Sequence, residues 1–261
     1  MRSVDFMYGT AWKEDATEEC VVAALAAGFR AIDTANQRKH YDEEGVGRAI
    51  ARAGVPRREL FVQSKFTFRA GQDHRLPYDP KAPIREQVAQ SYASSLEHLG
   101  VDRLDSYVLH GPSQRDGLGP DDREAWRAME ALPAAALGIS NVTARQLREL
   151  LELAAVRPAY VQNRCYAELG WDAEIRALCR AEGLTYQGFS LLTANRQAVA
   201  RLPTLAAKYG VQPAQIVFRF AQQVGMLPLT GTTDPRHMKQ DLAIGAFTLA
   251  PDEVAMIENL G

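Results

Sequence analysis

Short apolar runs alternate with longer amphipathic runs along almost the whole chain. The apolar runs have the length of buried strands, and we expect strands at residues 6–11, 29–35, 60–66, 105–111, 134–140, 159–166, 185–191 and 226–231. Helical spacing fills the intervals, with helices expected at 16–28, 43–54, 83–99, 121–131, 143–154, 171–182 and 234–243. Two shorter helices fit near 199–209 and 213–223, and a C-terminal one fits 251–259.

Eight repeats of strand and helix predict parallel βαβ units. Eight such units fit a closed barrel better than an open doubly wound sheet, and no GxGxxG fingerprint follows the first strand. The length of 261 residues is also close to the ~250 residues typical of such barrels. We therefore expect an α/β fold, a single (β/α)8 TIM barrel over residues 1–261 with extra helices near the C-terminus. The longest irregular stretch, 67–82, is predicted to be a mobile loop.

Composition narrows the functional classes. A net charge of −2 with no polybasic tract gives no indication of nucleic-acid or membrane binding. No run approaches the ~20 apolar residues of a membrane helix, and the first residues do not resemble a signal peptide. Cys20, Cys165 and Cys179 lack metal-ligand spacing, and their odd number argues against a disulfide framework. We expect a cytoplasmic globular protein with free thiols and no metal site, and the sequence leaves its partner proteins unknown.

Titratable residues collect where consecutive expected strands end. Asp33 ends the second strand and Tyr41 follows it, Lys65 ends the third strand, and His110 ends the fourth. A lysine on an apolar strand needs a counter-ion, and Asp33 is the natural one. Alone, the pair could be a structural ion pair and His110 a structural histidine. The active residues of such a barrel lie at the carboxyl ends of its strands. The occurrence of all these titratable residues at the ends of consecutive strands therefore favours a catalytic role over a structural one.

The residue types suggest one kind of chemistry. A tyrosine has an ordinary pKa of ~10, and a nearby lysine ammonium is expected to lower it. An aspartate would hold the lysine charged, and a histidine could orient a carbonyl oxygen near the phenol. The four residues therefore suit the protonation of a carbonyl oxygen while a nucleophile attacks the carbon.

The sequence after the last strand suggests the source of that nucleophile. TGTTDPRHMKQDL reads as a turn, an N-cap at Thr233 or Asp234, and a helix starting at Pro235. A helix N-terminus after the eighth barrel strand is a ready anion site, although a plain capped turn is the alternative. With Ser140, Asn141 and Gln162 offering polar partners on other strands, a nicotinamide dinucleotide that supplies hydride would fit.

At these residues the sequence resembles the aldo-keto reductases, from Gly9 to Leu260. The likeness is carried by GFRAIDTA with Tyr41 and EEGVG, and by LFVQSK, LDSYVLHGP, LGISNVTARQL, VQNRCY and PLTGTTDPRHMKQDL. It implies a catalytic tetrad of Asp33, Tyr41, Lys65 and His110. It also implies a cofactor site for NADP(H), with NAD(H) possible. That site comprises Ser140, Asn141 and Gln162 at the carboxamide, Phe189 on the nicotinamide ring, Thr230, Gly231, Thr232 and His237 near strand 8, and Gln240 and Asp241 at the adenine.

The chain departs from the family pattern at four places. The family's tyrosine lies five residues after the aspartate, where this chain has Arg38, whereas Tyr41 lies eight after. The phosphate-binding lysine and arginine near strand 8 are replaced by Leu229 and His237. We therefore predict that NADP(H) still binds, but with a smaller preference over NAD(H) than is usual in the family. The helix before strand 5 is shortened. The sequence stops at Gly261, where family members commonly continue into a substrate-covering loop, so we expect an open active site. Arg38 and Lys39 fit either a solvated loop or an anion-binding role.

The leading hypothesis is a nicotinamide-dependent oxidoreductase that reduces an aldehyde or ketone to an alcohol, or runs the reverse, by hydride transfer with a tyrosine proton donor. The alternative is a non-catalytic cofactor-binding regulatory subunit or redox sensor on the same barrel. A metal-dependent barrel hydrolase lacks the HxH pattern expected on the first strand.

Overall fold

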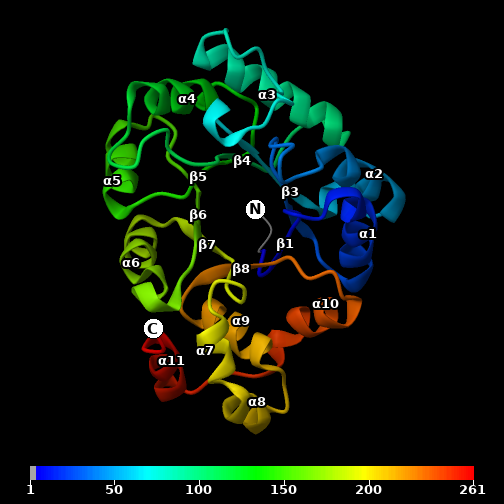
Figure 1. The fold of residues 1–261 in the computed structure, drawn as a ribbon, viewed down its shortest axis with the longest axis vertical. Coiled ribbons are helices and arrows are strands. Elements are labelled where there is room, and N and C mark those ends of the chain that lie inside the picture. Colours follow the sequence, from blue (N-terminus) through cyan, green and yellow to red (C-terminus); the bar gives the residue numbers. More distant parts are fainter. Residues whose placement is uncertain (1–3) are drawn as a thin grey trace.

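A computed structural model describes residues 4–261. Eight parallel strands form a closed barrel in sequence order, and β8 pairs with β1 to close it (Figure 1). The strands are β1 (Met7–Gly9), β2 (Ala31–Asp33), β3 (Phe61–Phe66), β4 (Ser106–Leu109), β5 (Leu137–Ser140), β6 (Tyr160–Arg164), β7 (Thr185–Phe189) and β8 (Met226–Thr230). All eight predicted strands are confirmed, and each is shorter than predicted.

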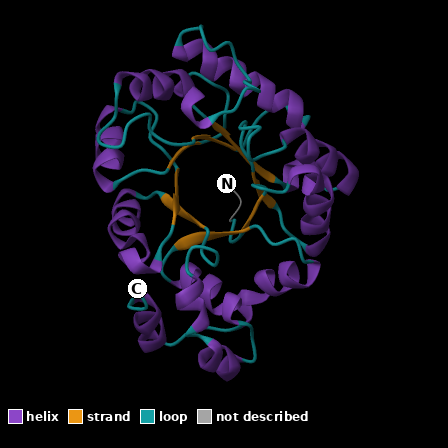
Figure 2. Ribbon diagram, viewed as in Figure 1, coloured by secondary structure: helices purple, strands orange, loops and turns teal. Residues whose placement is uncertain are grey.

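Helices form an outer ring around the barrel (Figure 2). Those between strands are α1 (Thr17–Ala27), α2 (Glu43–Ala53), α3 (Ile84–Leu99), α4 (Pro120–Glu130), α5 (Ala144–Leu153), α6 (Ala173–Glu182), α7 (Arg196–Ala200), α8 (Pro203–Tyr209) and α9 (Pro213–Gln223). After β8 come α10 (Pro235–Leu242) and α11 (Pro251–Glu258). Short 3₁₀ segments are η1 (Glu14–Ala16), η2 (Arg57–Glu59), η3 (Arg69–Gly71), η4 (Ala167–Asp172) and η5 (Ala243–Ala246). The barrel and the extra C-terminal helices were predicted correctly.

Two helix predictions were wrong in detail. The helix expected near 199–209 is two helices, because Pro203 begins α8 and has no N–H to continue α7. The helix expected to begin at residue 171 begins at Ala173 instead. Trp171 and Asp172 have left-handed backbone angles, with φ of +54° and +58°, and therefore cannot belong to a regular α-helix.

Apolar side chains fill two regions. The larger lies between the barrel and the helices and includes the fully buried Trp126 and Trp171. The smaller lies inside the barrel and consists of Met7, Ala31, Phe61, Tyr160, Leu227 and Leu229. The remaining interior, toward the carboxyl ends of the strands, holds buried polar residues, among them Asp33, Gln63 and Lys65. Because buried polar groups need partners, the barrel concentrates its hydrogen-bonding chemistry at one end.

The stretch 67–82 is hydrogen-bonded to the segment that follows β2. The Gln37 side chain donates to the Gly71 carbonyl at 2.7 Å, and the Gln72 side chain donates to the Asn36 carbonyl at 2.8 Å. The Tyr78 hydroxyl donates to the Thr67 carbonyl at 2.8 Å within the stretch itself. The mobility of this loop stays a prediction, but its base is fixed against the strand exit that carries Tyr41.

Within residues 4–261, no helix has both the length and the apolar character needed to cross a membrane. The three cysteines are free and buried.

Candidate active site

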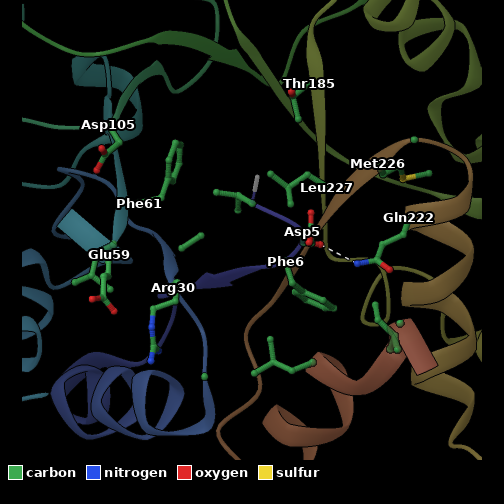
Figure 3. A pocket seen from close by; sticks show the side chains of 18 of the residues that line it. Asp5, Phe6, Arg30, Glu59, Phe61, Asp105, Thr185, Gln222, Met226 and Leu227 are labelled. Atoms are coloured by element: carbon green, nitrogen blue, oxygen red, sulfur yellow. Dashed lines mark hydrogen bonds between the residues drawn. The ribbon is translucent and has the colours of Figure 1, made fainter. Parts of the chain in front are cut away.

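Two large cavities lie at opposite ends of the barrel. One of about 1100 Å³ opens at the amino ends of the strands, beside Phe6, Arg30 and Asp105 (Figure 3). The other, of about 820 Å³, opens at the carboxyl ends and is lined by Asp33, Tyr41 and His110 among others. Since active residues of such barrels gather at the carboxyl ends, the second cavity is the candidate active site.

Asp33 and Lys65 form an ion pair at the base of this cavity. The Lys65 ammonium donates to the two Asp33 carboxylate oxygens at 2.7 and 2.8 Å and to the Thr34 carbonyl at 2.8 Å. Both side chains are buried, and burial lowers the pKa of Lys65 while the charge of Asp33 opposes that effect. The predicted counter-ion of the lysine is confirmed. Its three acceptors satisfy the ammonium and fix its position.

Two glutamines also donate to the Asp33 carboxylate, and a third glutamine connects them. Gln63 donates to the carboxylate at 2.7 Å and Gln162 at 3.0 Å, and both also donate to the Gln187 carbonyl oxygen at 2.9 Å. Gln187 donates back to Gln63 at 3.1 Å. Gln63 and Gln187 were not identified from the sequence. The alternation of side chains along a strand could have identified them. Each lies two residues before an identified residue, Lys65 or Phe189, and therefore on the same face of its strand.

Tyr41 lies over this ion pair. The Lys65 ammonium is 5.2 Å from the centre of the Tyr41 ring, and the Tyr41 and His110 rings meet edge to face with centres 5.9 Å apart. The four residues predicted to act together are therefore neighbours. The expected pKa shift of Tyr41 was wrong in direction. Burial, then the negative charge of Asp33, raise the pKa of Tyr41, and only Arg164 opposes them. The phenol is accordingly protonated at neutral pH.

His110 is a neutral imidazole in this cavity. Burial first, and then the nearby charges of Lys65 and His40, lower the pKa of His110 to about 3. Its Nδ1 lies 2.6 Å from the Thr67 hydroxyl. Because that hydroxyl has no other acceptor among the described residues, it donates to Nδ1, and the imidazole proton is placed on Nε2. Thr67 thus makes His110 a hydrogen-bond donor, a role that the sequence did not reveal.

The Trp12 and His40 rings contact each other at the rim, tilted by 35°. Their ring centres are 3.7 Å apart, and both residues line the cavity. Trp12 is 68% exposed, and the Nδ1 of His40 is buried without a hydrogen-bond partner among the described residues. Burial, then the charge of Lys39, lower the pKa of His40. His40 lies next to Tyr41 in the chain and lines the same cavity, so it is the competing candidate for the proton donor.

Arg38 points away from the cavity. Its guanidinium lies 2.8 Å from the Glu44 carboxylate and 3.0 Å from the Nε2 of His98. Neither Arg38 nor Lys39 lines the cavity. Both residues instead line a separate pocket of about 460 Å³ beside Arg75 and His98, so the choice between a solvated loop and an anion-binding role stays a prediction.

The residues predicted at the carboxamide are brought together at β5 and β6. Ser140 and Gln162 are partners in the strand register, and the Ser140 hydroxyl donates to the Gln162 carbonyl at 2.6 Å. Asn141 has a left-handed φ of +55°, and its side chain donates to the His110 carbonyl at 2.7 Å. All three line the cavity together with Phe189. The Asn141 and Gln162 side-chain oxygens accept no hydrogen bond from the described residues, which leaves two acceptors for an amide.

The segment from β8 to α10 has the predicted cap. Asp234 is the N-cap and accepts from the Arg236 backbone N–H at 2.8 Å, and Pro235 is the first helical residue. The Arg236 guanidinium also pairs with the Asp234 carboxylate at 2.7 Å. Thr230, Gly231, Thr232, His237, Gln240 and Asp241 all line the cavity, and their contacts with a cofactor stay a prediction. Asp241 is buried and accepts from the Thr230 hydroxyl at 2.8 Å, and burial raises the pKa of Asp241 to about 6.

The turn after β8 also contacts a buried cation, Lys13, which was not identified from the sequence. Its ammonium donates to the Gly231 carbonyl at 2.7 Å, at the turn between β8 and α10. Burial lowers the pKa of Lys13. The signal was a lysine just beyond the first strand, beside Trp12.

These features fit a nicotinamide dinucleotide. The cavity extends from Tyr41 and His110, past Phe189, to Thr232 before α10 and His237 within it. The Phe189 ring and the two unused amide oxygens suit the nicotinamide ring and its carboxamide. The cavity wall at Thr230, Gly231 and Thr232 leaves room for the phosphates beside the capped start of α10. The residues present therefore suit the group that the sequence predicted.

Comparisons with known proteins agree with this interpretation. Residues 6–261 match the model of the aldo/keto reductase family. An aldo-keto reductase of Mycobacterium avium is 33% identical over 95% of this chain and 82% of the relative. A 2,5-diketo-D-gluconic acid reductase B of a Corynebacterium is 31% identical over 92% of this chain and 82% of the relative.

Solved structures show the same fold. The aldo/keto reductase from Brucella melitensis superposes with a TM-score of 0.83 and 26% identity, covering 98% of this chain and 95% of that one. The Bombyx mori aldo-keto reductase, solved in complex with NADP, gives a TM-score of 0.80 and 26% identity, covering 98% and 88%.

Proposed function

The chain belongs to the aldo/keto reductase family, and we propose that it interconverts an aldehyde or ketone and the corresponding alcohol with NADP(H), NAD(H) being possible. One observation carries the proposal. A protonated tyrosine, a neutral histidine and a buried lysine–aspartate pair meet in one cavity at the carboxyl ends of the strands. Proton donors placed over a fixed cation are what the reduction of a carbonyl requires.

The cofactor would be held along the cavity. Phe189 would contact the nicotinamide ring, and Ser140, Asn141 and Gln162 its carboxamide. The turn at 230–234 and Lys13 would hold the phosphates. When bound, the nicotinamide supplies or accepts the hydride.

Side chains of the protein would orient and protonate the carbonyl oxygen of the substrate. The Nε2–H of His110 would donate a hydrogen bond to the carbonyl oxygen and orient it. The Tyr41 hydroxyl would give its proton to that oxygen as the carbon is reduced. The remaining phenolate would be stabilised by the Lys65 ammonium, which Asp33 holds in place. In the reverse direction the same groups remove the proton from the alcohol.

The Bombyx mori relative in complex with NADP supports the choice of cofactor. A screen of aldehydes and ketones with NADPH and NADH, followed by the absorbance of the reduced nicotinamide, tests the proposal. Carbonyl-dependent oxidation of the cofactor is expected. Tight cofactor binding without turnover of any carbonyl compound would instead support a regulatory subunit or sensor.

A further inference from the structure

Arg164 is an unpaired cation inside the active-site cavity. It ends β6 at an inward position, two residues after Gln162, and it lines the cavity. Its side chain is exposed, and its guanidinium makes no ion pair or hydrogen bond with any described residue. The guanidinium carbon lies 5.5 Å from the centre of the Phe189 ring. That contact restricts the orientation of the guanidinium while leaving its N–H groups free.

The charges around Arg164 leave its positive charge uncompensated. The Asp33 carboxylate is neutralised by Lys65, and the Asp241 carboxyl is hydrogen-bonded to Thr230 at the far side of the cavity. His110 is neutral, since its pKa lies near 3. An anion that enters the cavity would therefore find one free guanidinium.

The position of Arg164 indicates the substrate rather than the cofactor phosphates. In the closed barrel β6 lies four strands from β2, on the opposite side, so Arg164 faces the segment that carries Tyr41. The charge of Arg164 acts against the raised pKa of Tyr41, which places the two groups within electrostatic reach. The predicted phosphate site lies elsewhere, at β8 and α10, where the Lys13 ammonium donates to the Gly231 carbonyl.

The guanidinium also determines which anion would bind. Its planar set of N–H donors matches a carboxylate, which it binds through two parallel hydrogen bonds. We propose that Arg164 binds a carboxylate of the substrate, and that the preferred substrates are carbonyl acids with the carboxylate several bonds from the reacting carbon. This inference rests on the proposed carbonyl reduction and names its substrate class.

Matched substrates separate charge from shape. We would compare kcat/KM for 4-carboxybenzaldehyde and for 4-formylbenzamide, which has nearly the same size and no charge. The wild-type protein should prefer the acid by about ten- to hundredfold, the scale of a hydrogen bond to a charged group. Arg164→Met should bring this ratio close to one, and Arg164→Lys should keep part of it. Arg180→Met, at an exposed arginine on α6 outside the cavity, should leave the ratio as in the wild type.

Three results would overturn the proposal. An unchanged ratio in Arg164→Met would show that the arginine does not recognise the carboxylate. An equal loss on both aldehydes would indicate a structural role. A tenfold weaker NADPH affinity in Arg164→Met, with the ratio kept, would assign the arginine to the cofactor.

A binding measurement keeps the test independent of turnover. Calorimetric titration with benzoate and with benzamide, with and without NADP⁺, should show benzoate binding that Arg164→Met weakens at least tenfold. If neither aldehyde is reduced, the proposed function fails, whereas loss of benzoate binding in Arg164→Met would still support the carboxylate site. Equal benzoate affinity in the wild type and the variant would contradict it.

Discussion

The Lys65 ammonium lies 2.7 and 2.8 Å from the two carboxylate oxygens of Asp33, and Tyr41 covers the pair with its ring centre 5.2 Å from that ammonium. Removing one member of a buried ion pair leaves the other charge unpaired. That charge destabilises the protein, because water does not reach it to replace the lost partner. The two residues should therefore act as a unit rather than as separate contributors.

This coupling is testable in a double-mutant cycle with Asp33→Asn, Lys65→Met and the double variant. Each single change should lower kcat/KM strongly. Expressed as a free energy, the loss in the double variant should be much smaller than the sum of the losses in the two single variants. Circular dichroism of each variant controls for folding. Simple additivity of the two losses would show that the pair is not coupled.

Thr67 should determine the tautomer of His110. Thr67→Val keeps the shape of the side chain but removes the hydroxyl that donates to Nδ1. The imidazole proton could then lie on either nitrogen, and we expect kcat/KM to fall by roughly tenfold, the scale of one lost hydrogen bond. Thr67→Ser retains the hydroxyl and should recover most of the rate. Nitrogen chemical shifts of His110 check the tautomer directly, and an unchanged Nε2–H form in Thr67→Val would refute the assignment.

Asp241 should make stability depend on pH. Its pKa is about 6 in the folded protein and ~3.9 in an unfolded chain, so the folded state holds the proton more tightly. Its contribution to stability is therefore complete below pH ~4 and is lost as the pH rises through about 6. At pH 8 the Asp241→Asn variant should have a higher free energy of unfolding than the wild type, because the amide carries no charge that burial disfavours. The difference should reach up to roughly 3 kcal/mol for two pKa units.

Denaturant titrations of the cofactor-free protein measure this difference. The gap between Asp241→Asn and the wild type should nearly close at pH 4, where the wild-type carboxyl is protonated in the fold. A gap that is the same at both pH values would mean that packing, not ionisation, causes it.

Cofactor choice should be less strict than the family pattern suggests. The position of the family's phosphate-binding lysine is occupied by Leu229, an apolar residue buried inside the barrel. The nearby Arg236 is already paired with Asp234, so its guanidinium is not free for a 2′-phosphate. We predict that NADPH binds, with a dissociation constant less than a thousandfold below that of NADH. Fluorescence quenching by each cofactor measures the two constants. A larger preference would mean that Arg236, released from Asp234, or Lys239 binds the phosphate.

The sequence predicted the parts of this site that follow from strand position. Asp33, Lys65 and His110 each lie where an apolar run ends, and parallel strands in a barrel bring their ends to one rim. Gln63, Thr67 and Arg164 were missed because their function depends on which groups they face. Alternation along a strand gives the face of a residue but not its partner.

The pKa of Tyr41 could not be predicted from the sequence for a related reason. A nearby lysine lowers the pKa of a phenol, whereas burial raises it, and the balance depends on how closely the cavity is packed. In this structure burial and Asp33 prevail. The helix near 199–209 was similarly misjudged, although Pro203 gave a signal for the break.

The identity of the proton donor is the most direct question, because His40 and Tyr41 are adjacent and both line the cavity. The decisive measurement is kcat/KM for a reducible aldehyde, together with the NADPH dissociation constant, in Tyr41→Phe and in His40→Gln. Tyr41→Phe removes only the hydroxyl and should lower kcat/KM by about 10²-fold or more while NADPH affinity is retained, and His40→Gln should keep most of the turnover. Full turnover in Tyr41→Phe with turnover abolished in His40→Gln would contradict the assignment and make His40 the proton donor.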